Sequence, residues 1–205
     1  QCIKVFRTAL LTVTMLVGAG FQYVTEGEAF QAPLASSPRL IPAVDPVSSP
    51  GPFEQSIASV QALVMDGHGA IYAGSFGHGI FRSADRGSTW VRVGGGVTDP
   101  FILSLSSTKD GAIYAGTFRG GVFRSRDDGH SWQPVSTGLK QLEVKALLAV
   151  DQELFAGTGD GVYRLRHSDD HWIPVTTGLE NILVHALARS PDGTLFAGTS
   201  GKGLF

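Results

Sequence analysis

The sequence predicts an all-β fold built from tandem copies of one four-stranded unit, and three observations support this prediction. A segment that starts with I-Y-A-G at Ile71 returns as I-Y-A-G at Ile113 and as L-F-A-G at Leu154 and Leu195. Apolar residues occupy consecutive positions in these segments, so both faces of each small sheet are expected to be covered. Glycine is abundant, with 27 residues, which suits many tight turns. The aligned glycines, which are 42, 41 and 41 residues apart, are Gly74, Gly116, Gly157 and Gly198.

The bulk composition is that of an ordinary globular protein. The chain has 205 residues, of which 42% are hydrophobic and 17% charged, and its formal net charge is −2. A net charge this close to zero does not favour nucleic acid or an anionic membrane surface as a partner. The only cysteine is Cys2, so no intramolecular disulfide can form.

The N-terminal segment, residues 1–29, reads as a secretory signal peptide. Lys4 and Arg7 precede an apolar run over residues 9–20, and small residues follow it. The run is short for a bilayer core, which needs about 20 apolar residues. The alternative is an uncleaved membrane anchor, which would be the only membrane contact. The sequence therefore predicts a secreted or periplasmic protein.

Residues 30–55 are predicted to be a linker rich in proline and serine, without a core of its own. The repeats occupy residues 56–205. The four predicted units are residues 58–96, 100–138, 142–178 and 182–205.

Each unit divides into four short strands. Four-stranded units of this period, covered on both faces, are typical of a β-propeller, whose antiparallel sheets are arranged around an axis. The fourth unit breaks off in its third strand, whereas closed propellers need about 4–8 units. The prediction is therefore an incomplete arc of about three and a half units, with residues outside this chain supplying the others. The first strands begin at Val60, Ile102, Val144 and Leu183.

An acidic turn with the pattern S-x-D-x-G-x-[ST]-W joins the third and fourth strands. The aspartate and serine oxygens can accept hydrogen bonds from the turn's own N–H groups, the glycine supplies a positive φ, and the tryptophan points inward. Because the pattern recurs in successive units, a structural role is favoured over catalysis or calcium binding. The structural residues assigned to these turns are Ser83, Asp85, Gly87, Trp90, Ser125, Asp127, Gly129, Trp132 and Trp172.

With these turns, the segment 60–205 resembles the Asp-box family, also called the bacterial neuraminidase repeat (BNR) family. Its members include sialidases, sortilin-type receptors, xyloglucanases and photosystem II assembly factors, and the last three groups are the branch that this chain resembles. The resemblance implies a β-propeller fold but leaves the function open, because propellers host many activities. The third turn departs from the pattern, since Leu165, His167, Asp169 and His171 replace its polar residues and glycine.

The resemblance implies that ligands meet the rim opposite the acidic turns. That rim is formed by the turns between second and third strands and by the links between units. Its residues differ from unit to unit, which is how a repeat scaffold makes one particular surface, although an ordinary solvated loop is the alternative. The candidate ligand-binding residues are Phe76, His78, Phe118, Arg119, Asp160 and Lys202. The candidates on the links are Asp99, Lys140, Glu143, Glu180 and Asn181.

Sialidases bind a sugar carboxylate with an arginine triad, and Arg82, Arg124 and Arg164 look like such a set. These arginines occupy the same place in successive third strands, so they should fan out around the axis, and we assign them a structural role. No R-I-P segment occurs in the chain. The tyrosines assigned to the core are Tyr72, Tyr114 and Tyr163.

No catalytic residue, cofactor or metal site is predicted. His167 and His171, with Asp169 and Asp170 between them, have the right ligand types, but a hairpin does not guarantee that they share one face. The favoured hypothesis is an exported, non-enzymatic scaffold that binds a protein or a glycan. The alternative is a fragment of a xyloglucanase-like or sialidase-like glycoside hydrolase whose catalytic residues lie mostly outside this chain. A hydrolase would require a carboxylate pair about 5–10 Å apart, for which Asp99 and Glu143 are candidates.

Overall fold

The computed structural model describes residues 59–166, 169–175 and 177–205. They belong to one compact body that spans Gly51–Phe205. The predicted signal segment, the whole predicted linker and His167 lie outside the described residues. Within the described ranges there is no helix, and so none that could span a membrane.

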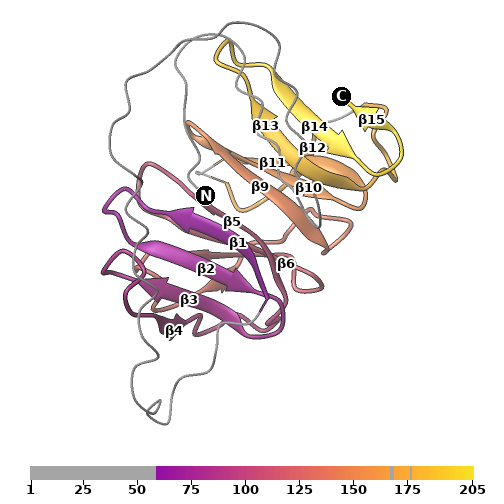
Figure 1. Ribbon diagram of the computed structural model, residues 1–205. Helices are drawn as coiled ribbons and strands as arrows, with labels where there is room; N and C mark the ends of the chain where they lie inside the picture. The colour runs from indigo at the N-terminus through magenta and orange to yellow at the C-terminus, as the bar shows by residue number, and fades with distance from the viewer. Residues whose placement is uncertain (1–58, 167–168, 176) are drawn as a thin grey trace, which may run out of the picture. The chain divides into compact units, whose positions relative to one another are not determined.

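The described strands form four antiparallel sheets, and in each sheet the strands lie side by side in the order of the sequence (Figure 1). The first sheet contains β1 (Val60–Met65), β2 (Ile71–Ser75), β3 (Gly79–Ser83) and β4 (Val91–Val93). The second contains β5 (Ile102–Ser107), β6 (Ile113–Thr117), β7 (Val122–Ser125) and β8 (Gln133–Pro134). The third contains β9 (Val144–Val150), β10 (Glu153–Thr158), β11 (Gly161–Arg166) and β12 (Ile173–Pro174). The fourth contains β13 (Val184–Arg189), β14 (Leu195–Thr199) and β15 (Gly203–Leu204).

We call these sheets, with their turns and links, the first to fourth units. The first strand of each unit packs against the first strand of the next, so β1 lies beside β5, β5 beside β9 and β9 beside β13. The units therefore fan out from their first strands, as Figure 1 shows from the indigo unit to the yellow one. The all-β fold of four-stranded antiparallel sheets in an open, incomplete arrangement is confirmed.

The hydrophobic core lies at the junctions between units. At the first junction, Tyr72 and Ile80 of the first unit pack with Ile102, Ile113 and Trp132 of the second. The second junction repeats this arrangement between the second and third units. A middle sheet is thus covered on both faces, and every residue of β6 is buried. This explains why the apolar residues are consecutive in the sequence instead of alternating.

A glycine in the second strand of each of the first three units allows the next sheet to approach closely. A Cβ atom at Gly116 would lie 2.8 Å from the Val144 side chain of the next unit and 2.3 Å from Ser104 Oγ. Gly74 and Gly157 face Ile102 and Val184 in the same way. The recurring glycines therefore mark where the units touch as well as where the chain turns.

Candidate functional site

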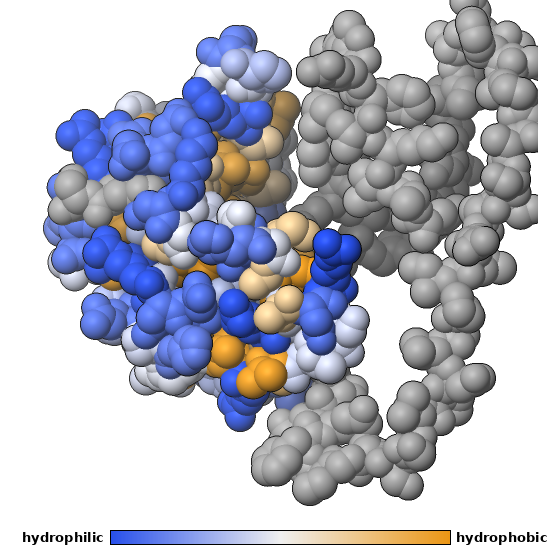
Figure 2. All heavy atoms as spheres, turned by 90° about the vertical axis from the view of Figure 1, so that its left-hand side faces the viewer, coloured by the Kyte–Doolittle hydropathy of each residue, from blue (hydrophilic) through white to orange (hydrophobic). Residues whose placement is uncertain are grey.

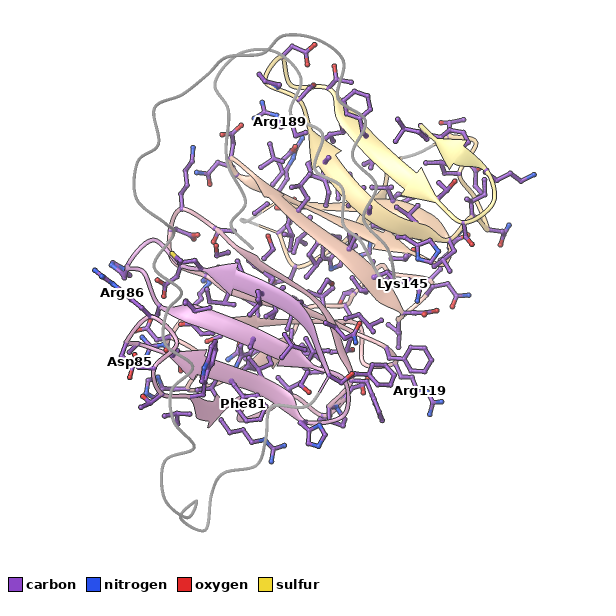
Figure 3. The ribbon with its side chains drawn as sticks, viewed as in Figure 1. Phe81, Asp85, Arg86, Arg119, Lys145 and Arg189 are labelled. Atoms are coloured by element: carbon purple, nitrogen blue, oxygen red, sulfur yellow. The ribbon has the colours of Figure 1, made fainter. Side chains whose placement is uncertain are left out.

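The two ends of the strands form two different rims (Figure 3). Asp85 and Arg86, in the first acidic turn, lie at one end of the sheets, and Arg119 lies at the other. We call these the acidic-turn rim and the loop rim. Figure 2 faces the acidic-turn side and shows a mostly hydrophilic surface with smaller apolar areas.

The first two acidic turns are closed by the same hydrogen bonds. Ser83 Oγ accepts a hydrogen bond from Gly87 N at 2.7 Å and donates one to Asp85 Oδ1 at 2.7 Å. Asp85 also accepts hydrogen bonds from the backbone N–H of Thr89 at 2.8 Å and from its hydroxyl at 2.6 Å. In the second turn, Ser125, Asp127, Gly129 and Ser131 repeat these bonds.

These bonds stabilise the charged form of each aspartate. The hydroxyl and backbone N–H of Thr89, together with the Ser83 hydroxyl, lower the pKa of Asp85 to about 2. The equivalent bonds from Ser131 and Ser125 lower the pKa of Asp127 to about 2. A carboxylate that is held ionised by its own turn is poorly suited to act as a general acid near neutral pH.

The third turn has lost this network but keeps its tryptophan. Leu165, at the position of the first serine, is fully buried. The indole N–H of Trp172 donates a hydrogen bond to the Val135 carbonyl of the second unit at 2.6 Å, whereas that of Trp132 bonds Gly129 in its own turn at 3.0 Å. The Trp172 indole thus bonds across the junction to the second unit instead of within its own turn.

The second and third tryptophans pack against the preceding unit. Trp132 is 4% exposed and Trp172 is fully buried. Trp90 of the first unit is only partly buried, and no sheet precedes it among the described residues. All three tryptophans occupy equivalent positions in their units. The difference in their burial therefore comes from whether another unit precedes them.

The three equivalent arginines fan out, as the sequence predicted. Arg82 lies 3.8 Å from Asp128 and Arg124 lies 3.2 Å from Asp170, and in both pairs the carboxylate belongs to the next acidic turn. Arg164 lies 3.2 Å from Glu153 of its own unit. These pairs link neighbouring units or strands, so they do not converge on a shared anion site.

Three aromatic rings gather on the loop rim between the first and second units. The ring centroid of Phe76 lies 4.8 Å from that of Phe101 and 6.3 Å from that of Phe118. The guanidinium of Arg119 lies 5.1 Å from the centre of the Phe118 ring, and Phe76 is 41% exposed. We call Phe76, Phe101, Phe118 and Arg119 the rim cluster. The structure thus brings together three of the predicted rim residues.

Sequence reasoning missed Phe101. It lies on the link just before β5 and forms an isolated β-bridge with Phe76. The only available signal was a large aromatic residue in a link that otherwise contains glycine, valine, threonine, aspartate and proline. Its contact with Phe76 depends on how two units meet, which the repeat pattern does not specify.

A buried carboxylate supports this cluster. Asp99 accepts hydrogen bonds from the backbone N–H groups of Phe101 at 3.1 Å, Arg119 at 2.5 Å and Gly120 at 3.0 Å. It therefore connects the link to the turn between β6 and β7. Buried acceptors are normally satisfied in this way, and all of these donors belong to the protein itself.

The other rim residues lie apart from this cluster or are engaged in internal bonds. The imidazole Nδ1 of His78 lies 3.5 Å from Ser75 Oγ in the first unit. Asp160 accepts hydrogen bonds from Tyr163 Oη at 2.8 Å and from Asn181 N at 3.0 Å, and it lies 3.6 Å from Lys140 Nζ. Burial and Asp160 raise the pKa of Tyr163 to about 12.

The remaining carboxylates of the links are also paired. Glu143 lies 2.9 Å from Lys145, and Glu180 accepts a hydrogen bond from Gly178 N at 2.9 Å. Lys202 is exposed in the fourth unit. In the described part of the chain, no group of three or more His, Cys, Asp or Glu residues could hold a metal ion. What the loop rim offers is an aromatic and cationic surface.

Comparison with known proteins bears on the fold. No family model matches the chain, and no curated protein matches it. Among solved structures, the extracellular domain of the one-component system BT4673 from B. thetaiotaomicron is similar, with a TM-score of 0.62 and 22% identity over 71% of this chain and 20% of that one. The xyloglucanase of the GH74 group from Xanthomonas campestris has a TM-score of 0.54 and 22% identity over 68% of this chain and 26% of that one.

A third similar structure is PorZ, a surface component of the type-IX secretion system of Porphyromonas gingivalis. It has a TM-score of 0.58 and 15% identity over 78% of this chain and 28% of that one. The chain has a β-propeller fold. Its four units are blades of an open arc, and they span only 20–28% of the length of these propeller-containing chains. Identities this low show the fold alone.

Proposed function

We propose that this arc belongs to an exported, non-enzymatic propeller of the Asp-box type that binds a protein or a glycan through its loop rim. The rim cluster carries this proposal. Aromatic residues and arginine are enriched at the energetic hot spots of binding surfaces, and aromatic rings bury a large area. An aromatic face also suits the apolar face of a sugar ring.

The position of the cluster supports the same function. Phe76 and Arg119 are exposed, while Asp99 fixes the backbone at Phe101, Arg119 and Gly120 through three hydrogen bonds. A binding surface that is already ordered loses little entropy on association. The resemblance of the acidic turns to the Asp-box pattern supports the family assignment. Extracellular and surface proteins among the similar structures support export.

The proposal is tested by comparing the effects on binding of substitutions on the two rims. The purified chain is screened against an array of polysaccharides and sialosides and against periplasmic proteins, and any ligand found is then titrated. Phe76→Ala and Arg119→Ala should each weaken binding about tenfold or more. Arg126→Ala, an exposed change on the acidic-turn rim, should leave the affinity within about twofold. Full affinity in both rim variants contradicts the proposal.

The second candidate is a fragment of a glycoside hydrolase. Its support is the structural similarity to GH74 enzymes, including the one from Xanthomonas campestris. Against it, Asp99 and Glu143 are held by internal bonds, and Asp99 is 8% exposed. Turnover of a polysaccharide by the full-length protein that is lost in Asp99→Asn or Glu143→Gln, with the fold intact, would favour the hydrolase.

A further inference from the structure

Two exposed arginines accompany the aromatic rings at the first junction. Arg119 lies at the loop rim, and its guanidinium is 5.1 Å from the centre of the Phe118 ring (Figure 3). Arg92, on β4, reaches the turn that begins at Phe76. A Cβ atom at Gly79 in this turn would lie 3.7 Å from Arg92 Nη2. Cations therefore lie close to both of the turns that carry the exposed rings.

Neither of these guanidinium groups is neutralised by a carboxylate of the described residues. The lysines of the same rim at the second junction are neutralised, because Lys140 lies 3.6 Å from Asp160 and Lys145 lies 2.9 Å from Glu143. The acidic group nearest the rim cluster, Asp99, is 8% exposed and accepts three backbone N–H bonds. The exposed charge of the loop rim at the first junction is therefore positive.

A hollow of about 500 Å³ continues from the rim cluster along the first junction. Gly79 and Pro100 line it. They connect it to the cluster, because Pro100 precedes Phe101 and its carbonyl accepts N–H bonds from Gly77 at 3.1 Å and Gly79 at 3.0 Å. Arg92 also lines the hollow, whose volume is typical of ligand clefts. Its apolar lining includes Ile80, Val91, Val93 and Val97.

The hollow is open because the link after β4 lacks side chains. Gly94 and Gly95 line it, and their equivalents in the second blade are Ser136 and Thr137. The equivalence follows from the backbone, since Gly95 and Thr137 accept the same N–H bond from the tryptophan of the next blade. In the second blade the Ser136 hydroxyl accepts a hydrogen bond from Val122 N at 2.9 Å and so occupies this place. The hollow therefore arises where the chain departs from its own repeat.

The aromatic rings are confined to the same junction. At the second junction, Glu143 stands at the position of Phe101 and Gly159 at that of Phe118. Phe76 is 41% exposed, and the other two rings are partly buried. A protein–protein interface buries about 800 Å² on each partner, with an apolar centre. The small aromatic surface with flanking cations therefore fits a sugar chain better than a folded protein.

We propose that the rim cluster and the adjoining hollow bind a linear acidic glycan of the polyuronate class. This inference rests on the proposed function of the loop rim and names its ligand. The apolar face of one sugar ring packs on Phe76, and its carboxylate pairs with Arg119. A following sugar reaches the hollow, where its carboxylate pairs with Arg92. The planar carboxylate of a uronate matches the fork of N–H groups on a guanidinium, which neutral sugars cannot do.

The experiment is calorimetric titration of the full chain with trimers of galacturonate, glucuronate and mannuronate. At least one trimer should bind saturably. The monomer of that uronate should bind at least about tenfold more weakly, because it cannot reach both arginines. The methyl ester of the same trimer, which keeps the sugar rings and loses the charge, should also bind at least about tenfold more weakly. Added salt should weaken binding of the free acid more than that of the ester.

Matched arginine variants locate the binding. Arg119→Gln and Arg92→Gln should each weaken binding of the trimer about tenfold or more, because each removes a charged hydrogen-bonding partner. Arg126→Gln, the same change at an exposed arginine of the acidic-turn rim, should leave the affinity within about twofold. Arg92→Gln should leave the affinity for the monomer within about twofold, since one sugar occupies only the rim cluster.

The possible contrary results have different meanings. Equal affinity for the trimer and its methyl ester, with binding lost in Phe76→Ala, would overturn the acidic ligand and leave the binding function of the rim intact. Tighter binding of a polyglutamate peptide than of every uronate would also overturn the proposal, because the partner would then be an acidic polypeptide. Absence of binding by all three uronate trimers would overturn it as well. Uronate binding that persists in Phe76→Ala and Arg119→Gln would contradict the function of the loop rim itself.

Discussion

The three tryptophans should contribute unequally to stability, because they are buried to different extents. Trp132 and Trp172 are buried at junctions between blades, whereas Trp90 has the same local turn but is only partly buried. The indole N–H of Trp90 still bonds its own turn, to the Gly87 carbonyl at 3.2 Å. The difference between Trp90 and the others therefore comes from the neighbouring blade.

This difference predicts unequal effects of the same substitution. Trp132→Ala should lower the free energy of unfolding by about 3–5 kcal/mol, because it leaves a cavity at the first junction. Trp90→Ala should cost less than about half as much, since its side chain is already in contact with water. Urea denaturation of both variants measures the difference. Equal losses would show that the junction does not determine the stability.

The lowered pKa of Asp127 predicts a defined pH dependence. An unfolded aspartate has a pKa of about 3.9, and the folded value is about 2. A pKa that folding lowers contributes stability above the unfolded value, and this contribution is lost as the pH falls from about 4 towards 2. Asp127→Asn should therefore be less stable at pH 7 and should lose less stability between pH 4 and 2 than the unchanged chain.

Denaturation at a series of pH values measures this effect. As a control, Ser131→Ala removes the side-chain hydroxyl that donates a hydrogen bond to Asp127. This change should raise the pKa of the Asp127 carboxyl, as an NMR titration would measure. Parallel pH profiles for the unchanged chain and Asp127→Asn would mean that the turn does not hold the carboxylate ionised.

Residue patterns predicted the acidic turns because their bonds are local. Ser83, Asp85 and Thr89 lie within seven positions of one another, so the sequence alone contains the whole network. Phe101 was missed for the opposite reason, since its contact with Phe76 joins two blades.

At the scale of a strand and its turn, glycines set the distance between blades. Gly138 and Gly178 follow the fourth strands of successive blades and share a positive φ, of +97° and +88°. Only Gly138 lies against a neighbouring backbone. The two positions therefore separate the cost of backbone conformation from the cost of close approach.

Substituting each glycine by alanine measures these two costs. Gly178→Ala should destabilise the protein by about 1–2 kcal/mol, which is the penalty of a left-handed conformation for an L-residue. Gly138→Ala carries the same penalty and in addition forces Trp172 away, so its loss should be clearly larger. Thermal unfolding of the two variants compares them, and equal losses would contradict the close approach at the second junction.

At the scale of the whole molecule, the arc behaves as a series of blades that contact only their neighbours. In such a series, stability is roughly a sum of terms for each unit and each interface. The repeat pattern predicted this architecture because its period, its consecutive apolar residues and its turn glycines all agree. The pattern could not predict the rim cluster in detail, since residues at that rim differ between blades.

The most direct test of this account is hydrogen–deuterium exchange of the full chain, because exchange reports local opening of each strand. We predict the slowest exchange in β6 and β10, which are covered by blades on both faces. We predict much faster exchange in β14 and β15, because among the described residues the fourth blade contacts a neighbouring blade on one face only. Protection of β14 equal to that of β6 would contradict the claim that each blade is stabilised by filled junctions with its neighbours.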